Sequence, residues 1–169
     1  RPHTKTHKTP EIAHLQIRSG AKGLTVAKLS EAEVLVGCGF DDIFIANEIV
    51  GRLKAERLVQ LARRANIRVG VDSWECAEPL DIAARAAGVR ISVLIEVDTG
   101  LGRAGVRTEA EAVVLARRLV SCRGLDLSGI FTHEGHLYRA KDGPVSADSS
   151  PVADRMRSFS KRLTDESIL

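Results

Sequence analysis

Residues 1–8 (RPHTKTHK) carry the densest group of side chains in the chain that could do covalent chemistry. In a β-strand, side chains alternate between the two faces, so His3, Lys5 and His7 would lie on one side. Burial and neighbouring positive charge both favour the neutral form of a lysine amine, which is the form that Schiff-base catalysis requires. The alternative is a solvated basic segment without a catalytic role, and the remainder of the sequence must decide between them.

A second group of candidates lies in residues 100–105 (GLGRAG), which match the G-x-G-x-x-G pattern of dinucleotide-binding loops. The match is weak, because Asp98 and Thr99 separate the preceding strand from the first glycine. The following helix is also predicted to begin only at Thr108, beyond the last glycine. A turn that needs glycine is the better interpretation of this segment. Arg103 stands apart, because an arginine at a strand end can bind a phenolate or a carboxylate.

A third group comprises His133, His136 and Tyr138, which follow the last predicted strand. Their spacing differs from H-E-x-x-H, which places two zinc ligands on one helical face, so this segment alone does not indicate zinc. His133 continues one face of its strand and would meet Lys5 and Arg103 if the strand ends converge. The alternative for His133 is a hydrogen-bonded strand-end histidine without a role in a site.

Glu96 and Asp98 lie on one face of the strand that precedes the glycine-rich segment. Paired carboxylates occur in glycosidases, where they flank the substrate from two sides. Two neighbours on a single strand do not have that arrangement. We therefore expect these carboxylates to form ion pairs within the protein.

The composition indicates a soluble globular domain and excludes several classes of partner. Of 169 residues, 44% are hydrophobic and 28% are charged, as in ordered domains. A dispersed net charge of +3, with one Trp, one Tyr and four Phe, does not suit a nucleic-acid surface. No apolar stretch reaches the roughly 20 residues that cross a bilayer. We expect neither nucleic acid nor a membrane as a partner.

The cysteines indicate the cellular compartment. Cys38, Cys76 and Cys122 are odd in number, widely spaced and set among apolar residues. This distribution favours reduced, buried thiols and a cytoplasmic protein. No neighbouring residue suggests that any of them is catalytic.

The elements that must position these candidates alternate regularly between strands and helices. Capping boxes predict helix starts at Ser30 and Thr108, and Ser/Thr-Pro pairs predict helix starts near Pro10 and Pro151. A polar segment, residues 139–149, is long enough to be a lid or a binding loop. Six β-α units at intervals of about 20 to 25 residues predict a parallel sheet covered by helices. The predicted strands are residues 1–8, 23–29, 43–47, 67–71, 91–97 and 125–132.

Two α/β architectures fit this pattern, a doubly wound open sheet and a (β/α)8 TIM barrel of about 250 residues. Polar residues follow all six predicted strands, and a barrel gathers its site from many strand ends, whereas an open sheet uses one switch point. The sequence therefore predicts an incomplete (β/α)8 barrel with six of its eight units in residues 1–169. The strand-end residues are Lys5, His7, Lys28, Asn47, Asp72, Ser73, Asp98, Thr99, Thr132 and His133.

Four segments carry a family resemblance: residues 1–13 (RPHTKTHKTPEIA), 39–51 (GFDDIFIANEIVG), 98–106 (DTGLGRAGV) and 129–136 (GIFTHEGH). Together they resemble D-threonine aldolases and eukaryotic-type D-serine dehydratases. These are fold-type III pyridoxal phosphate enzymes related to the N-terminal barrel of alanine racemase. The similarity covers essentially the whole chain, and the K-T-H-K segment is specific.

The resemblance implies that residues 1–169 are a partial barrel domain that binds pyridoxal 5′-phosphate. It implies Lys5 as the lysine that carries the cofactor, with Lys8 as the second choice. Arg103 matches the arginine near the phenolic oxygen of the cofactor, and His133 matches the histidine beside its pyridine ring.

The implied activity is that of a lyase acting on small D-amino acids. It is a D-threonine aldolase-like cleavage of D-β-hydroxy amino acids to glycine and an aldehyde, or a D-serine dehydratase-like loss of water. His136 and Tyr138 are candidate proton-transfer residues. The alternatives are an amino-acid racemase, a non-catalytic pyridoxal phosphate-binding protein of the same fold and, more distantly, a nucleotide-binding oxidoreductase.

The resemblance also implies what residues 1–169 lack. In the family, the phosphate-binding loops follow the last barrel strands. A C-terminal β domain supplies a divalent-metal site and completes the active site in a homodimer. We therefore expect no metal ligands in residues 1–169, a divalent metal and a homodimer in the full-length protein, and weak or no activity from the fragment alone.

Overall fold

The computed structural model describes residues 1–139 and 148–169, and its centre is a parallel sheet of five strands in chain order. Within the described strands the order never reverses, whereas a doubly wound fold needs such a reversal. The predicted barrel type, in incomplete form, is therefore confirmed. The strands are β1 (Leu24–Val26), β2 (Asp42–Glu48), β3 (Asn66–Val71), β4 (Ile91–Glu96) and β5 (Leu125–Phe131).

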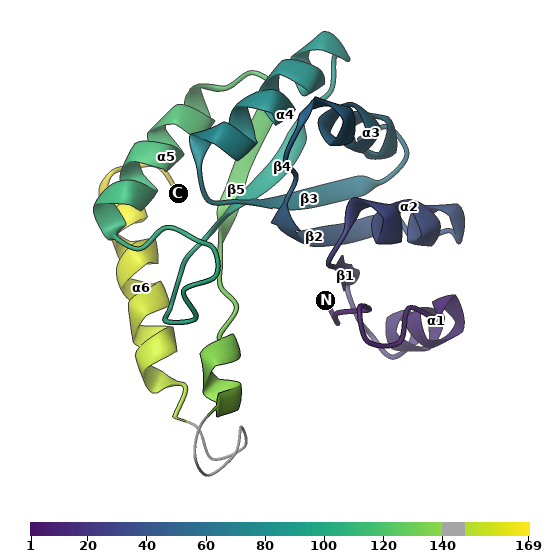
Figure 1. Cartoon of the computed structure of the whole chain (residues 1–169), viewed down its shortest axis with the longest axis horizontal. Coiled ribbons are helices and arrows are strands. Elements are labelled where there is room, and N and C mark those ends of the chain that lie inside the picture. The colour runs from purple at the N-terminus through teal and green to yellow at the C-terminus, as the bar shows by residue number, and fades with distance from the viewer. Residues whose placement is uncertain (140–147) are drawn as a thin grey trace.

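Helices connect the strands and lie along the outer side of the sheet. In Figure 1, α5, α4, α3, α2 and α1 form an arc around the fan of strands. None of the described helices has both the length and the apolar character needed to cross a membrane. The helices are α1 (Pro10–Arg18), α2 (Leu29–Gly37), α3 (Arg52–Ala62), α4 (Trp74–Ala86), α5 (Glu109–Ser121), α6 (Ser150–Asp165) and the short 3-10 helix η1 (Gly135–Arg139).

Alternating burial along the strands separates the core from the inner face of the sheet. Ile43 and Ile45 of β2 are fully buried in the hydrophobic core, whereas Phe44 between them is only partly buried. On the inner face, the Phe44 and Phe131 rings meet edge to face, with their centroids 4.9 Å apart. Gly70 leaves room for this pair, because a Cβ there would lie 2.8 Å from Phe131 Cζ. The barrel interior is therefore lined by aromatic side chains from β2 and β5.

The predicted opening strand is wrong beyond Thr4. His3 forms an isolated parallel bridge with Thr25, and the Thr4 N–H donates to Thr25 O at 2.8 Å. Residues 4–7 then form turns, and the Lys8 N–H returns to Thr4 O at 2.8 Å. The alternation that predicted one shared face for Lys5 and its flanking histidines does not apply. In the described part of the chain the sheet has five strands, and an isolated bridge at His3 takes the place of the first of the six predicted strands.

One of the two predicted capping boxes is confirmed. The Thr108 hydroxyl accepts the N–H of Glu111 at 3.2 Å and so begins α5. At Ser30 the prediction is wrong, because α2 begins one residue earlier and Glu31 accepts the Ala27 N–H at 2.9 Å. The predicted lid, residues 139–149, falls mainly on residues 140–147, which lie outside the described residues.

Candidate active site

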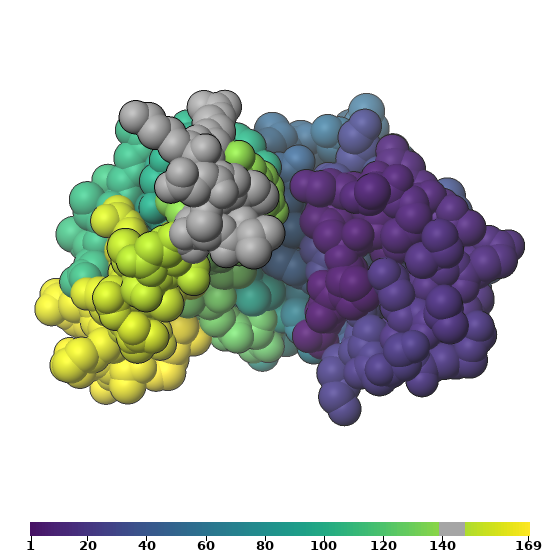
Figure 2. Space-filling view, turned by 90° about the horizontal axis from the view of Figure 1, so that it is seen from below, coloured from purple at the N-terminus to yellow at the C-terminus, as the bar shows by residue number. Residues whose placement is uncertain are grey.

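A cavity of about 370 Å³ opens at the carboxyl ends of the strands. Figure 2 shows the molecule hollowed between the purple N-terminal residues and the green and yellow C-terminal half. Both the location and the volume are typical of small-ligand sites in barrels. The cavity is lined by Arg1, His3, Lys5, Thr25, Ala27, Phe44, Ala46, Asn47, Arg103, Phe131, Thr132 and His133.

Three residues predicted for the cofactor site, Lys5, Arg103 and His133, meet in this cavity. They come from the N-terminal segment, the glycine-rich turn and the end of β5. Burial, then the positive charges of Arg103 and Lys5, lower the pKa of His133. His133 is therefore a neutral imidazole at neutral pH, beside two cations.

Lys5 lies at the exposed rim of the cavity, within a turn that His3 closes. The Lys5 backbone N–H donates to His3 Nδ1 at 3.2 Å, which leaves the other ring nitrogen of neutral His3 to carry the proton. Burial, then the charge of Lys5, lower the pKa of His3. The turn thus presents the lysine amine to the cavity beside a second neutral imidazole.

The other polar residues of the N-terminal segment have structural contacts. Lys8 forms an ion pair with Glu31 at 3.3 Å and has a left-handed φ of 51°. His7 Nδ1 accepts the Thr9 N–H at 3.1 Å. Neither Lys8 nor His7 is among the residues that line the cavity. Of the two candidate lysines, Lys5 therefore lines the cavity and Lys8 does not.

Residues 100–105 form a turn that needs glycine, as predicted. The Asp98 carboxylate shapes this turn. The Asp98 carboxylate accepts the N–H groups of Gly100 and Gly102, both at 3.0 Å. Gly105 has a φ of 102°, and a Cβ there would lie 2.6 Å from the Asp98 nitrogen. The helix follows only at Glu109, so these glycines do not open a helix as a dinucleotide fingerprint does.

The expected ion pairs of the two β4 carboxylates are present. Arg103 Nη2 donates to Glu96 Oε1 at 3.3 Å, and Arg107 lies 3.9 Å from Asp98. Glu96 is only 3% exposed. Burial and the neighbouring carboxylate of Glu48 raise the pKa of Glu96 to about 7, against the opposing effect of Arg103. The sequence reasoning missed Glu48.

The end of β5 is fixed by a chain of hydroxyl groups before His133. Thr132 Oγ1 donates to Val97 O at 2.7 Å and hydrogen-bonds to Thr99 Oγ1 at 2.8 Å. A Cβ at Gly135 would lie 2.9 Å from His133 Nε2, so the absence of a side chain there leaves room for the imidazole. These contacts hold His133 at the rim of the cavity.

The two predicted proton-transfer residues lie outside the described lining of the cavity. Tyr138 is 64% exposed, and its ring centroid is 6.0 Å from that of His133. His136 packs on the glycine-rich turn, where a Cβ at Gly100 would lie 3.3 Å from its Nε2. Its Nδ1 is buried without a hydrogen-bond partner among the described residues. Tyr138 is therefore near the site, whereas His136 supports the turn that carries Arg103.

Several lining residues were not singled out for the site from the sequence. Phe44 could have been found from its alternation with the buried Ile43 and Ile45 along β2. Phe131 had no such signal, because only Leu125 is buried along β5. Asn47 and Thr132 were among the strand-end polar residues, and His3 was noted only as a neighbour of Lys5. No sequence signal distinguished Asn47, Thr132 or His3 from other strand-end side chains.

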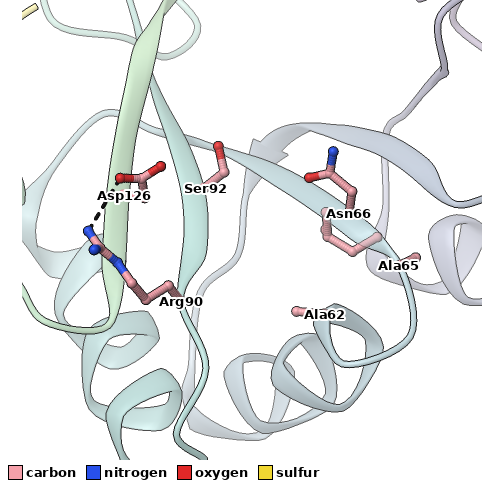
Figure 3. A pocket seen from close by; sticks show the side chains of 7 residues that line it. Ala62, Ala65, Asn66, Arg90, Ser92 and Asp126 are labelled. Carbon is pink, nitrogen blue, oxygen red and sulfur yellow. Dashed lines mark hydrogen bonds and ion pairs between the residues drawn. The ribbon is translucent and has the colours of Figure 1, made fainter.

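A second polar cavity, of about 320 Å³, lies at the amino ends of β3, β4 and β5 (Figure 3). Arg90 Nη2 lies 3.3 Å from Asp126 Oδ1 across its mouth, and Ser92 Oγ hydrogen-bonds to Ser128 Oγ at 2.7 Å. Barrel active sites form at the carboxyl ends of the strands, and this end contributes to stability. We therefore place the functional site in the cavity that contains Lys5.

The comparison with protein families matches residues 1–166 to the alanine racemase N-terminal domain. D-threonine aldolase of Arthrobacter sp. is 38% identical over 167 residues, which are 99% of this chain and 44% of that protein. 3-Hydroxy-D-aspartate aldolase of Paracoccus denitrificans (strain Pd 1222) is 30% identical over 155 residues, which are 89% of this chain and 40% of that protein. The chain thus spans less than half the length of these curated relatives.

Solved structures give the same relationship. The crystal structure of D-threonine aldolase from Filomicrobium marinum has a TM-score of 0.81 at 38% identity and covers 98% of this chain and 42% of that one. D-threo-3-hydroxyaspartate dehydratase from Delftia sp. HT23 has a TM-score of 0.87 at 30% identity and covers 100% of this chain and 45% of that one. These matches confirm the predicted resemblance to fold-type III pyridoxal phosphate enzymes. The chain belongs to the alanine racemase N-terminal domain family.

Proposed function

We propose that residues 1–169 form a partial pyridoxal 5′-phosphate-binding barrel domain of a lyase that acts on D-amino acids. The observation that carries the proposal is the meeting of Lys5, Arg103 and His133 in one cavity at the carboxyl ends of the strands. These residues come from three distant parts of the sequence, and the parallel strands bring them to one end of the sheet. The D-threonine aldolase relative, 38% identical across 99% of the chain, supports the choice of reaction class.

The residues of the cavity suit a flat, anionic aromatic cofactor. Phe44 and Phe131 supply an apolar wall, and neutral His133 can lie against a ring without adding charge. Arg103 supplies a guanidinium for an anionic oxygen. Lys5 supplies an accessible amine. The cavity volume of about 370 Å³ lies within the range for small-molecule sites.

Pyridoxal phosphate, when bound, supplies an electron sink that stabilises negative charge on the reacting carbon of the substrate. Lys5 Nζ would hold the cofactor covalently and exchange with the amine of the substrate. Arg103 would donate hydrogen bonds to the phenolic oxygen. His133 would fix the plane of the pyridine ring of the cofactor. Tyr138, which lies beside His133, would move a proton at the oxygen of its own side chain. His136, which packs on the turn that carries Arg103, remains a second candidate for proton transfer.

For a β-hydroxy-D-amino acid, two reactions fit the same site. Cleavage of the bond between the α and β carbons gives glycine and an aldehyde, whereas loss of the β-hydroxyl group eliminates water. We favour cleavage, because the relative matched over 99% of the chain is an aldolase. The second candidate is dehydration, because the solved dehydratase from Delftia sp. HT23 matches all of this chain with a TM-score of 0.87.

We propose three further properties for the full-length protein. The first is a divalent metal, which the resemblance assigns to a C-terminal domain; one solved relative is described as a dehydratase mutant in the metal-free form. In the described part of this chain, no group of three or more His, Cys, Asp or Glu side chains could hold a metal. The second is a homodimer. The third is a cytoplasmic location, because the three cysteines are free thiols.

The proposed function is tested by adding pyridoxal phosphate to the purified full-length protein and to its Lys5→Ala and Lys8→Ala variants. We expect a visible absorbance band in the wild type and in Lys8→Ala, and none in Lys5→Ala. Incubation with D-threonine should then release glycine from the first two proteins only. A product mixture of ammonia and a 2-oxo acid would indicate the dehydratase. A protein that shows the band but converts no D-amino acid would be a cofactor-binding protein without lyase activity.

A further inference from the structure

Glu48 and Glu96 form a pair of acidic side chains beside the cavity that the proposed function does not use. Glu48 ends β2, and Glu96 ends β4. Between them lies β3, where Gly70 pairs with Glu48 in the sheet register and the Phe131 ring packs where a side chain would lie. The neighbouring Phe131, which pairs with Glu96, is uncharged. The Glu48 carboxyl group is near enough to act on that of Glu96 both through its charge and as a hydrogen-bonding side chain.

Each of the two carboxyl groups has one orphaned oxygen. Among the described residues, Glu48 Oε1 and Glu96 Oε2 are buried and have no hydrogen-bond partner. A buried acceptor without a donor is costly, and two ionised carboxylates in contact also repel each other. One shared proton relieves both problems, because it supplies a donor for the second oxygen and leaves the pair with a single negative charge.

The other oxygen of Glu96 faces Arg103. Its Oε1 accepts from Arg103 Nη2 at 3.3 Å, and Arg103 lines the cavity. Repulsion from Glu48 and burial raise the pKa of Glu96, and Arg103 is the cation that opposes them. Glu48 from β2 and Arg103 from the glycine-rich turn are thus the charged groups that act on Glu96. With one proton on the pair, the charges of the three groups add to zero.

We propose that Glu48 and Glu96 share one proton and, as a singly charged pair, hold Arg103 at the cavity as positioning residues. The role of Arg103 toward the cofactor rests on the proposed function, whereas the shared proton does not. Loss of that proton adds a second negative charge beside Arg103. The guanidinium is then drawn toward the acid pair and away from the phenolic oxygen. The alternative is an ordinary ion pair between Glu96 and Arg103 in which Glu48 takes no part.

Infrared difference spectroscopy across pH 5 to 9 tests the shared proton in the purified full-length protein without cofactor. We expect a buried, protonated carboxyl band that disappears as the pH rises through about 7. Both Glu48→Gln and Glu96→Gln should lack this titration. The matched control is Glu56→Gln, which changes an exposed acid paired with Arg52, and it should keep the band. Absence of the titration in the wild type, or its survival in Glu48→Gln, would overturn the proposal.

The positioning role is tested by the dissociation constant of pyridoxal phosphate, measured at several pH values. In the wild type, affinity should fall as the pH rises through 7. Glu96→Gln should weaken binding about tenfold at pH 6, the effect of losing one charged hydrogen bond to Arg103. Glu48→Gln should bind pyridoxal phosphate at every pH with the affinity that the wild type has at pH 6. Thermal unfolding of each variant shows that it is folded. An unchanged pH dependence in Glu48→Gln would overturn the positioning role, whereas a protein with the infrared titration but no cofactor binding would contradict only the proposed function.

Discussion

The Lys5 backbone N–H donates to His3 Nδ1 at 3.2 Å, and this hydrogen bond closes the turn that carries the lysine to the cavity. It replaces the strand that the sequence predicted for this segment. His3→Ala removes the acceptor and should loosen the turn, which lowers the affinity for pyridoxal phosphate about fivefold to tenfold, the equivalent of one hydrogen bond. His3→Asn keeps a short polar side chain and should restore part of the affinity. Equal affinities of His3→Ala and the wild type would show that the turn does not position Lys5.

The protonation of His3 and His133 gives a pH dependence of stability. Burial and neighbouring cations lower the pKa of both imidazoles in the folded protein. The unfolded chain therefore binds more protons just below a pH of about 6.5, and the free energy of unfolding falls as the pH drops through that window. Urea unfolding at pH 7.5 and 5.5, with Glu96→Gln present in every protein to remove its opposing contribution, measures the decrease, and the double variant His3→Gln, His133→Gln should show a smaller one. A decrease of the same size in the double variant would assign it to other groups.

Glu96 has the opposite effect on stability over an overlapping pH range. Its pKa is raised from the ordinary value of 4.5 to about 7, so the folded protein binds the proton more tightly than the unfolded chain. Stability should fall as the pH rises from about 4.5 through 7, by up to about 3 kcal/mol. Glu96→Gln should remove this part of the pH dependence in urea unfolding. Parallel pH profiles for the wild type and Glu96→Gln would show that folding does not raise the pKa of Glu96.

Gly105 and Gly102 offer a matched test of the turn that carries Arg103. Both have positive φ, 102° and 70°, but only at Gly105 would a Cβ meet backbone, 2.6 Å from the Asp98 nitrogen. Gly102→Ala should cost about 1 to 2 kcal/mol, from the left-handed conformation alone. Gly105→Ala should cost more and should also weaken pyridoxal phosphate binding, because the turn must shift. The two free energies of unfolding from urea titration provide the comparison, and equal values would show that the close approach is relieved without moving Asp98.

The fold was largely predictable from the sequence, because strands such as β2 and β4 bury alternate residues. Ile43 and Ile45, for example, mark β2 as a strand with one face in the core. The opening segment does not have this pattern. Thr4 is its only buried residue, so nothing in the alternation of its polar side chains showed where the strand ends. The bridge at His3 is fixed by its pairing with Thr25, a contact that the local sequence does not encode.

The site was predictable where it depends on strand ends and not where it depends on contacts across the sheet. Arg103 and His133 follow β4 and β5, and parallel strands bring their carboxyl ends together. Glu48 was missed because a glutamate near a strand end is usually solvated. The register of β2 on β3 also shifts between Ile45 and Glu48, which changes where that side chain points. Bulges of this kind have no reliable signal in a single sequence.

The central claim is that Lys5 is the residue that binds the cofactor. Reduction of the full-length protein with borohydride in the presence of pyridoxal phosphate, followed by peptide mass spectrometry, tests it most directly. We expect a single stable adduct on Lys5, which is absent from Lys5→Ala and retained in Lys8→Ala. An adduct on Lys8, or unselective labelling of exposed lysines such as Lys22 and Lys54, would contradict the assignment.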